Sequence, residues 1–315
     1  MDGLSEKELI EALLRYRGSG ASLPVKNGDD AAVIEAGGKL LAVTTDALVQ
    51  GVHFEFSYCP PKNAGIKAME SAASDVVAMG GKPSYALIAL SAPSDLTQEL
   101  IEELYGGLEA SAKRIGCSII GGNVVVSAAP LSLTVTVLGE IQGADLICTR
   151  AGARPGDLIC ISGELGRAAA GLRALQKGLP GFKVLERAFL EPRCRVDLVE
   201  KLAPVATSMI DISDGLSSEL YHICDASVCG AVIDQDRLPT GEDLTELAAK
   251  SGSDPLALIF GGGEDYELLY TVHPEDRGAI AGYQIGTIEA EKGVRLKDKA
   301  GEVRELPRIG YDHFA

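Results

Sequence analysis

The segment LSLTVTVLGEI, Leu131–Ile141, has the strongest strand signal of the chain, because it is dense in apolar and β-branched residues. Two upstream segments have a similar composition. KLLAVTT at Lys39–Thr45 is predicted to be a buried strand, and SYALIALSA at Ser84–Ala92 another. We therefore expect these three segments to form the strands of one α/β unit.

Helices are predicted between these strands. A helix rich in small residues is expected over 61–80, since it opens with a proline in its first turn and ends at a Gly-Gly pair. Asp95 can cap a second helix that runs to about Ile115. The other elements predicted in this half are a short helix followed by a mobile Gly/Ser segment within 1–20, and a short strand at Ser118–Ile120 that enters Gly121-Gly122.

A second α/β unit is expected after a boundary near 143–150, where the turn sequence ARPGD follows at 153–157. Its predicted elements are a strand at Asp157–Ser162, a helix from Gly166 with a long helical stretch to about Leu202, a strand at Ser208–Ile212, a helix to about Ser227, and strands at Glu267–Val272 and Tyr283–Ile288. The expected fold class is therefore α/β, mixed α+β, with domains at 1–145 and 146–315.

Composition limits the classes of function. The chain has 315 residues and a formal charge of −16, which argues against a nucleic-acid partner because such partners need a basic face. No run of 18 apolar residues predicts a membrane span, and the start MDGLSEKELI lacks the features of a signal peptide. The seven cysteines form no CxxC pair, so we expect reduced thiols in a cytoplasmic protein.

Five acidic or glycine-rich segments are expected at strand ends or in turns. They are Gly28-Asp29-Asp30, Thr44-Thr45-Asp46, Ser74-Asp75, Asp211-Ile212-Ser213-Asp214-Gly215 and Gly261-Gly262-Gly263-Glu264-Asp265. Each by itself is equally compatible with a helix cap or a solvated loop. Taken together they favour a function, since ligands of open α/β sheets gather at strand ends.

One of these carboxylates has an unusual setting. Asp75 lies inside the predicted helix of small residues, where an unpaired charge would be costly. Carboxylates and hydroxyls together are the hard oxygen ligands that suit Mg²⁺. The sequence lacks the P-loop, Rossmann, protein-kinase, GxSxG and HExxH motifs, so any phosphate chemistry must use another arrangement.

The whole set of motifs resembles the thiamine-monophosphate kinase family, which belongs to the ATP-dependent superfamily of aminoimidazole ribonucleotide synthetase. The matching segments are GDDAAV (28–33), TTDALVQGVHF (44–54), SDVVAMGGKP (74–83), IIGGN (119–123), TRAGARPGD (149–157), IDISDGLSSEL (210–220), GGGEDYELL (261–269) and GYDHF (310–314). They span nearly the whole chain, and they are highly specific as a set.

The resemblance implies that ATP phosphorylates thiamine monophosphate, giving thiamine diphosphate. It also implies two α/β domains, an N-terminal one for ATP, Mg²⁺ and homodimer formation and a C-terminal one for the substrate. The motif match assigns several Mg²⁺ ions to Asp30, Thr44, Thr45, Asp46, Asp75, Asp211 and Asp214, with Asp29 beside Asp30. It assigns ATP to Tyr105, Gly121, Gly122, Arg150 and Ser213, and the thiamine phosphate to His53, Glu264 and Tyr311.

These assignments keep simpler alternatives. His53 can be a polar residue of a turn, Tyr311 an anchor of the tail, and Arg150 a surface charge. Tyr105 can be a core residue of its helix. The resemblance implies that Asp30, Asp46, Asp75 and Asp211 are catalytic through metal ions. No candidate for a covalent intermediate is present, so we expect direct transfer from ATP to the substrate phosphate.

One segment departs from the family pattern. The family usually has GGDT where this chain has Gly121-Gly122-Asn123-Val124. An asparagine still offers a carbonyl oxygen to a metal but brings no charge, so we expect a weaker Mg²⁺ affinity with activity retained. The alternatives left open are another ATP-dependent enzyme of the superfamily and a non-catalytic protein that binds nucleotide or thiamine phosphate.

Overall fold

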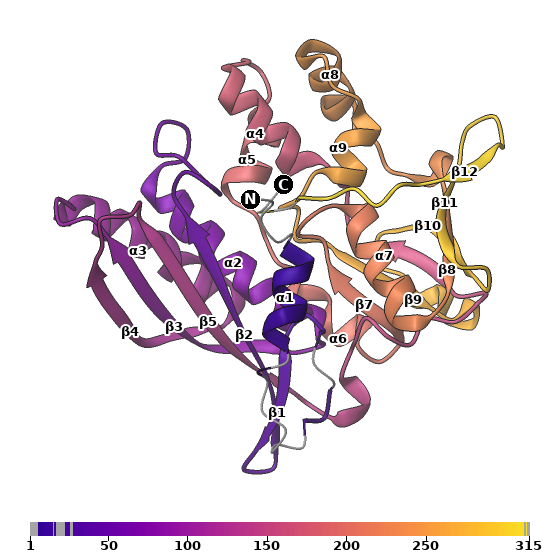
Figure 1. The fold of residues 1–315 in the computed structure, drawn as a ribbon, viewed down its shortest axis with the longest axis horizontal. Helices are drawn as coiled ribbons and strands as arrows, with labels where there is room; N and C mark the ends of the chain where they lie inside the picture. Colours follow the sequence, from indigo (N-terminus) through magenta and orange to yellow (C-terminus); the bar gives the residue numbers. More distant parts are fainter. Residues whose placement is uncertain (1–5, 15, 17–22, 26–27, 312, 314–315) are drawn as a thin grey trace.

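The computed structural model describes residues 6–14, 16, 23–25, 28–311 and 313, which form two β-sheets with helices around them (Figure 1). The first sheet has the strand order β1-β2-β5-β3-β4. Its strands are β1 (Ala32–Ala36), β2 (Lys39–Val49), β3 (Lys82–Ala92), β4 (Ser118–Val126) and β5 (Ser132–Ile141). The three predicted strands are confirmed, and β1 was not predicted.

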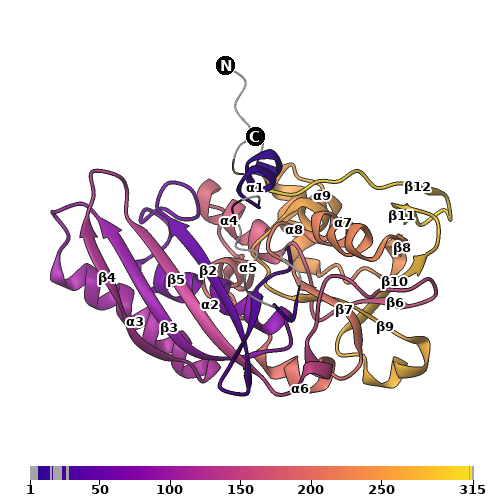
Figure 2. The same ribbon diagram turned by 60° about the horizontal axis from the view of Figure 1, so that its bottom comes forward.

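Two helices cover one face of this sheet, α2 (Pro61–Ala78) and α3 (Gln98–Ile115) (Figure 2). They approach closely because both carry a glycine at the crossing. A Cβ on Gly65 would meet the Leu104 carbonyl oxygen at 2.0 Å, and one on Gly107 would meet that of Lys62 at 1.9 Å. The other face of the sheet has no helix on it in the described chain, and Tyr85 and Leu87 of β3 are exposed there.

The second sheet has the order β12-β11-β8-β10-β6-β9-β7. Its strands are β6 (Leu158–Ile161), β7 (Ala206–Asp211), β8 (Gly230–Asp234), β9 (Leu268–Val272), β10 (Tyr283–Glu289), β11 (Gly293–Lys297) and β12 (Val303–Glu305). Helix α7 (Leu216–Ser227) packs on one face of it. The remaining helices are α1 (Glu6–Leu14), α4 (Arg167–Lys177), α5 (Lys183–Leu190), α6 (Val199–Leu202), α8 (Glu242–Ser251) and α9 (Pro255–Gly261).

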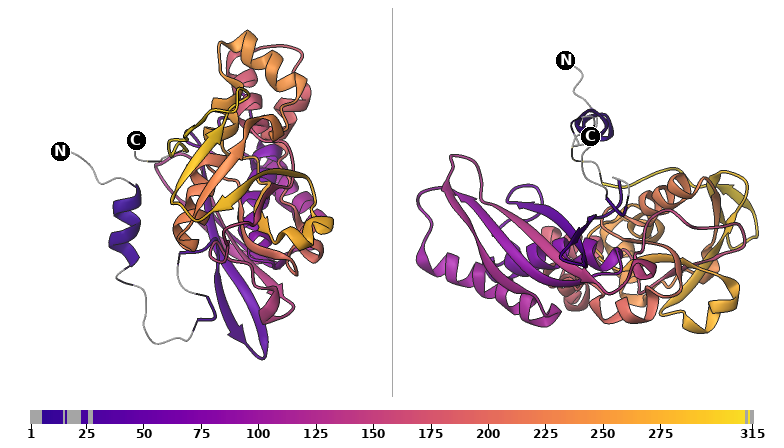
Figure 3. Two further views of the ribbon diagram at one scale, coloured as in Figure 1. Left: turned by 90° about the vertical axis from the view of Figure 1, so that its right-hand side faces the viewer. Right: turned by 90° about the horizontal axis from the view of Figure 1, so that it is seen from below.

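Helix α2 is the element that joins the two halves. It contacts β2 and β5 of the first sheet and also β7 of the second (Figure 3). Most of its residues are therefore buried, including Lys67, Glu70 and Ser74. The alanines, serines and glycine of its sequence leave room for neighbours on all sides, and any polar group it carries must find a partner inside the molecule.

Several predicted boundaries were wrong. Thr97 rather than Asp95 caps α3, because its side chain accepts from the Leu100 amide. Strand β4 continues through Gly121-Gly122 to Val126, since pairing with β3 holds the glycines extended. Likewise β2 runs on to Val49, so Thr44–Asp46 lie inside a strand and not at its end.

The long helix predicted to Leu202 is three helices. Gly178 ends α4 in the left-handed conformation, with φ of 60°, and α5 follows at Lys183. The strands β8, β11 and β12 were not predicted. The short N-terminal helix is confirmed as α1, whereas the Gly/Ser segment lies mostly outside the described residues. All seven cysteines are free and buried, and no helix among the described residues is long and apolar enough to cross a membrane.

Candidate active site

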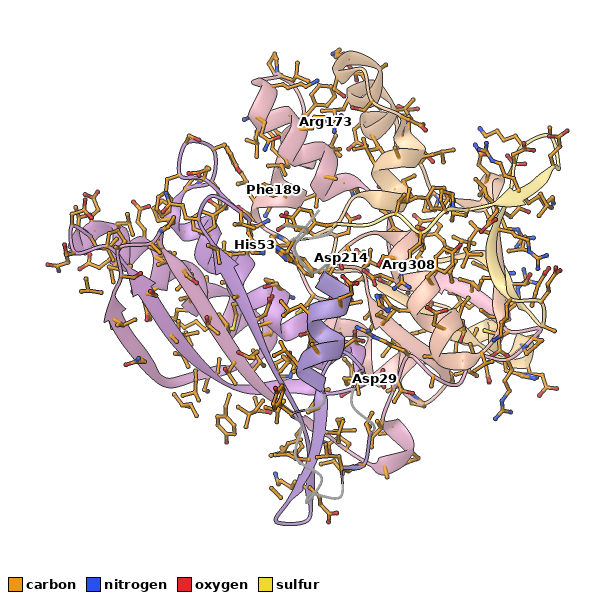
Figure 4. All side chains as sticks on the ribbon, viewed as in Figure 1. Asp29, His53, Arg173, Phe189, Asp214 and Arg308 are labelled. Carbon is orange, nitrogen blue, oxygen red and sulfur yellow. The ribbon has the colours of Figure 1, made fainter. Side chains whose placement is uncertain are left out.

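A cavity of about 450 Å³ lies where α2 and β2 face the second half of the chain. Its lining includes half of the predicted site residues: Asp46, His53, Asp75, Asp211, Ser213, Asp214, Glu264 and Tyr311. Figure 4 shows His53 and Asp214 in the region between the two halves, with Asp29 further along the same junction. Asp46 and Tyr311, which are 265 positions apart in the sequence, thus share one cavity.

Carboxylates gather at one end of this cavity. Asp75 of α2 accepts a hydrogen bond from the Thr44 hydroxyl of β2 at 2.6 Å. Asp211, the last residue of β7, accepts one from the Ser74 hydroxyl at 2.7 Å. Adjacent residues of α2 therefore reach both a strand of the first sheet and a strand of the second.

The charges at this end are poorly compensated. Burial raises the pKa of Asp75, and the nearby charges of Asp211 and Asp30 raise it further. Burial, followed by the charge of Asp30, raises the pKa of Asp211 to about 7. Raised pKa values of this kind indicate that too little positive charge lies near the carboxylates. A bound divalent cation would supply that charge.

Arg150 supplies the cation that lies closest to the group. Its guanidinium donates to Asp30 Oδ1 from Nη2 at 2.5 Å and from Nε at 3.1 Å, and its backbone N–H donates to Asp29 Oδ1 at 2.6 Å. Burial alone would lower the pKa of Arg150, but the Asp30 carboxylate raises it. Asp29 and Asp30 therefore hold the backbone and the side chain of the same arginine.

A second group of side chains, His53, Glu264 and Tyr311, lines the same cavity, and the Tyr311 backbone N–H donates to the Asp214 carbonyl at 3.3 Å. His53 Nδ1 accepts from the Val49 amide at 3.0 Å, so the proton of the neutral ring lies on Nε2. Burial lowers the pKa of His53, which favours that neutral form. The Tyr311 ring packs edge-on against His313, and His313 lies 5.2 Å from the His53 ring centroid.

Glu264 belongs to this second group. Its backbone has φ of 66°, a left-handed conformation that is uncommon for a residue other than glycine. Its N–H donates to the Ser213 carbonyl at 2.7 Å, which ties the Gly261–Glu264 loop to the loop after β7. The two groups that line the cavity are thus connected through the backbone.

Eight predicted residues do not line this cavity. Three of them, Asp30, Thr44 and Arg150, still belong to the carboxylate group through the contacts described above, and the other five lie elsewhere. Thr45 points to the uncovered face of the first sheet, where its hydroxyl lies 3.1 Å from that of Thr136. Asn123 lies on the edge strand β4, in register with Ala89, Thr134 and then Ala47 of β2. Asn123 and Ala47 are therefore three strand spacings apart, about 14 Å. Gly121 and Gly122 share this strand, and Tyr105 lies half-buried on α3.

The cavity also has residues that sequence reasoning missed. Glu219 of α7 is 2% exposed and accepts from the Asp214 amide at 2.9 Å, so it holds the loop after β7 from behind. Lys67 of α2 is 0% exposed and lies beside Glu264. For Lys67 the signal was a charge among small and apolar residues of its helix, as for Asp75, whereas Glu219 lies in a helix with several other polar residues and had no such signal.

The donor set fits a hard divalent cation. Asp30 Oδ2 is buried and makes no hydrogen bond within the described part of the chain. No three His, Cys, Asp or Glu side chains of the described residues surround one point as a complete ligand set. Mg²⁺ usually keeps several waters and binds through one or two carboxylates with substrate phosphates, so these residues suit it as a partial shell.

The comparisons with known proteins define the class. Residues 28–141 match the AIR synthase related protein, N-terminal domain, and residues 154–299 match the AIR synthase related protein, C-terminal domain. The chain therefore belongs to the AIR synthase related proteins, and its two sheets correspond to the two domains of that class.

Individual relatives narrow the assignment. The chain is 35% identical to the thiamine-monophosphate kinase of Aquifex aeolicus over 91% of its own length and 92% of the relative. It is 35% identical to that of Escherichia coli K12 over 96% and 95%. The solved structure "AaThiL complexed with AMPPCP and TMP" superposes with a TM-score of 0.88 at 33% identity, covering 98% and 97% of the two chains. Within its class, this chain belongs to the thiamine-monophosphate kinase family.

Proposed function

We propose that this protein transfers the γ-phosphoryl group of ATP to thiamine monophosphate, giving thiamine diphosphate and ADP. The observation that carries the proposal is the single cavity that crowded carboxylates line together with His53, Glu264 and Tyr311. Its support is the family relationship and the structural relative described with AMPPCP, an ATP analogue, and TMP.

The acidic end is the proposed position of the reacting phosphates. Asp30, Asp46, Asp75, Asp211 and Asp214, with Thr44, would hold Mg²⁺ there. Bound Mg²⁺ would offset the repulsion between two anionic substrates and polarise the phosphoryl oxygens. Arg150 and Ser213 lie beside these residues and would contact the ATP phosphates, because a guanidinium is a natural phosphate partner.

The second group of side chains is proposed to bind the organic part of thiamine monophosphate. His53 offers an Nε2–H donor, Glu264 an anionic acceptor, and Tyr311 an aromatic ring that is 51% exposed. Both proposed domains, 1–145 and 146–315, would contribute to each group. Asp75 and His53 precede the division between the domains, and Asp211 and Glu264 follow it.

We propose direct transfer between the substrates. An oxygen of the thiamine monophosphate phosphate attacks the γ-phosphorus in line while the bond to the β-phosphate oxygen breaks. Such a single displacement inverts a chirally labelled γ-phosphorus. Net retention of configuration would instead require a phosphorylated intermediate on the protein.

A homodimer formed through the first sheet would complete the site. Three exposed valines, Val124, Val125 and Val126, lie on the unpaired edge of β4, and Tyr85 and Leu87 lie on the uncovered face. Apolar groups arranged in this way are typical of an interface. Because Asn123 lies about 14 Å from β2 within one chain, we propose that the ATP and metal roles of Gly121, Gly122, Asn123 and Thr45, and that of Tyr105, involve the second copy.

The test is one assay. Purified protein is mixed with ATP, Mg²⁺ and thiamine monophosphate, and thiamine diphosphate and ADP are measured by chromatography. Equal amounts of both products, lost when EDTA replaces Mg²⁺, are expected. Binding without turnover would select a non-catalytic protein, and turnover of ATP with only another acceptor would select a different member of the superfamily.

A further inference from the structure

Lys67 is a buried cation beneath the cavity. Lys67, Ser71 and Asp75 recur every four residues on α2 and therefore lie on one face of the helix. Ser71 and Asp75 line the cavity, whereas Lys67 lies one turn nearer the start of the helix and is 0% exposed. The same helix thus carries a carboxylate toward the acidic end and an ammonium toward the second group of side chains.

The contacts of Lys67 account for its burial. Its Nζ lies 2.9 Å from Glu264 Oε1 and donates to the Phe189 carbonyl at 3.2 Å. It also lies 3.6 Å from the centroid of the Phe189 ring, a cation–π distance. An ammonium enclosed in this way is tolerated because Glu264 balances its charge.

Glu264 needs such an anchor. Its left-handed backbone is strained for a residue with a side chain, and such conformations persist when surrounding contacts enforce them. Its side chain is 23% exposed and lines the cavity, so one carboxylate oxygen is held by Lys67 while the group still faces the ligand space. The pair fixes where the negative charge lies.

We propose that Lys67 is a positioning residue that holds the Glu264 carboxylate in a fixed orientation for a cationic or N–H-bearing heteroaromatic group of the phosphate acceptor. This inference rests on the proposed function, because it assigns Glu264 to the acceptor end. Lys67 itself touches no substrate. Its effect is selective: it acts on acceptor binding and leaves the ATP end unchanged.

The experiment is a double-mutant cycle on the full-length protein with Lys67→Met, Glu264→Gln and the double variant. We expect Lys67→Met to raise the KM for thiamine monophosphate roughly 10- to 100-fold, the loss typical of a charge-assisted contact, with kcat and the KM for ATP within about threefold. Glu264→Gln should have a similar effect, and the double variant should be no worse than either single one. Lys62→Met makes the same change at an exposed position of α2 and should be silent.

A purely structural role for Lys67, through its contact with Phe189 of α5, predicts a different result from a selective rise in the KM for thiamine monophosphate. It would lower stability or kcat without a selective change in the acceptor KM, and it would add to Glu264→Gln. Either result overturns the inference. If Lys67→Met does not fold, the double variant, which removes both charges of the pair together, should fold and match Glu264→Gln in its acceptor KM.

Thermal unfolding of the same four proteins separates this inference from the proposed function. Coupling between positions 67 and 264 is measured without substrate and is expected as a melting-temperature loss that the second substitution partly restores. Absence of coupling overturns the Lys67–Glu264 inference. Coupling in a protein that does not phosphorylate thiamine monophosphate overturns the proposed function and leaves Lys67 as the anchor of Glu264.

Discussion

Arg150 and Asp30 form the ion pair that links the segment before β1 to the loop before β6. The guanidinium donates twice to the same carboxylate oxygen, and the Asp30 side chain is only 2% exposed. Arg150 therefore neutralises one carboxylate of a group in which the others repel one another. It also couples the first half of the chain to the second.

Arg150→Met should reveal both effects. It leaves Asp30 enclosed without its cation, so the free energy of unfolding should fall by about 3 kcal/mol in urea denaturation. The KM for ATP should rise at least about tenfold if the guanidinium contacts phosphate. The control is Arg187→Met, which removes an exposed ion pair with Glu191 and should cost less than about 1 kcal/mol. Equal losses in the two variants would contradict the prediction.

Asp75→Asn should separate stability from activity. The substitution removes a charge whose neighbours raise its pKa, so the melting temperature in EDTA should rise. The kcat should nevertheless fall roughly 100-fold or more, because a proposed metal ligand is lost. Asp276→Asn changes an exposed aspartate in the same way and should alter neither quantity. An active, unstabilised Asp75→Asn protein would refute the proposed role of Asp75.

Asn123→Asp tests the departure from the family pattern. The new carboxylate adds a negative charge to the proposed shared site, so the Mg²⁺ concentration for half-maximal rate should fall on the order of tenfold. Val124→Thr restores the neighbouring family residue without a charge and should leave the Mg²⁺ requirement unchanged. If Asn123→Asp has the same Mg²⁺ dependence as the parent, Asn123 only shapes the strand.

Asp265 should make stability depend on pH. Its carboxylate accepts from the Gly166 and Ala168 amides at the start of α4, yet burial raises its pKa to about 7. A carboxyl with a raised pKa binds a proton more tightly when folded, so its contribution is largest below pH 4 and is lost as pH rises toward 7. The free energy of unfolding should therefore fall by up to about 4 kcal/mol between those pH values, and Asp265→Asn should remove this fall. The same pH dependence of the free energy of unfolding in both proteins would contradict this.

Val126→Lys tests the homodimer. A charge on the exposed β4 edge should turn a dimer into a monomer in sedimentation experiments, since it opposes edge pairing. Activity should fall with the dimer if the second copy completes the ATP site. Val184→Lys, at a residue of α5 that is 60% exposed, is the matched control and should stay dimeric. A monomeric parent protein would end the dimer proposal.

Whether an element was predicted correctly depends on whether short-range or long-range interactions determine it. Strands and helices with strong local patterns, such as β5 and α2, were predicted correctly because composition alone favours them. The predicted cap Asp95 was wrong because aspartate and threonine both suit a cap position, and only the hydrogen bond in the structure identifies Thr97. Strand β4 was predicted too short because glycines indicate a turn unless a neighbouring strand pairs with them.

The sequence by itself determined the family and the inventory of carboxylates, because the motifs GDD, TTD, SD, ISDG and GGGED are specific as a set. Only the tertiary structure decided which groups meet: Thr44 with Asp75, Ser74 with Asp211, Arg150 with Asp30, and Lys67 with Glu264. It also showed that Asn123 lies away from the carboxylates of its own chain. The physical reason is that charge interactions depend on distance and burial, and local composition does not indicate which partners 31 to 197 residues apart will meet.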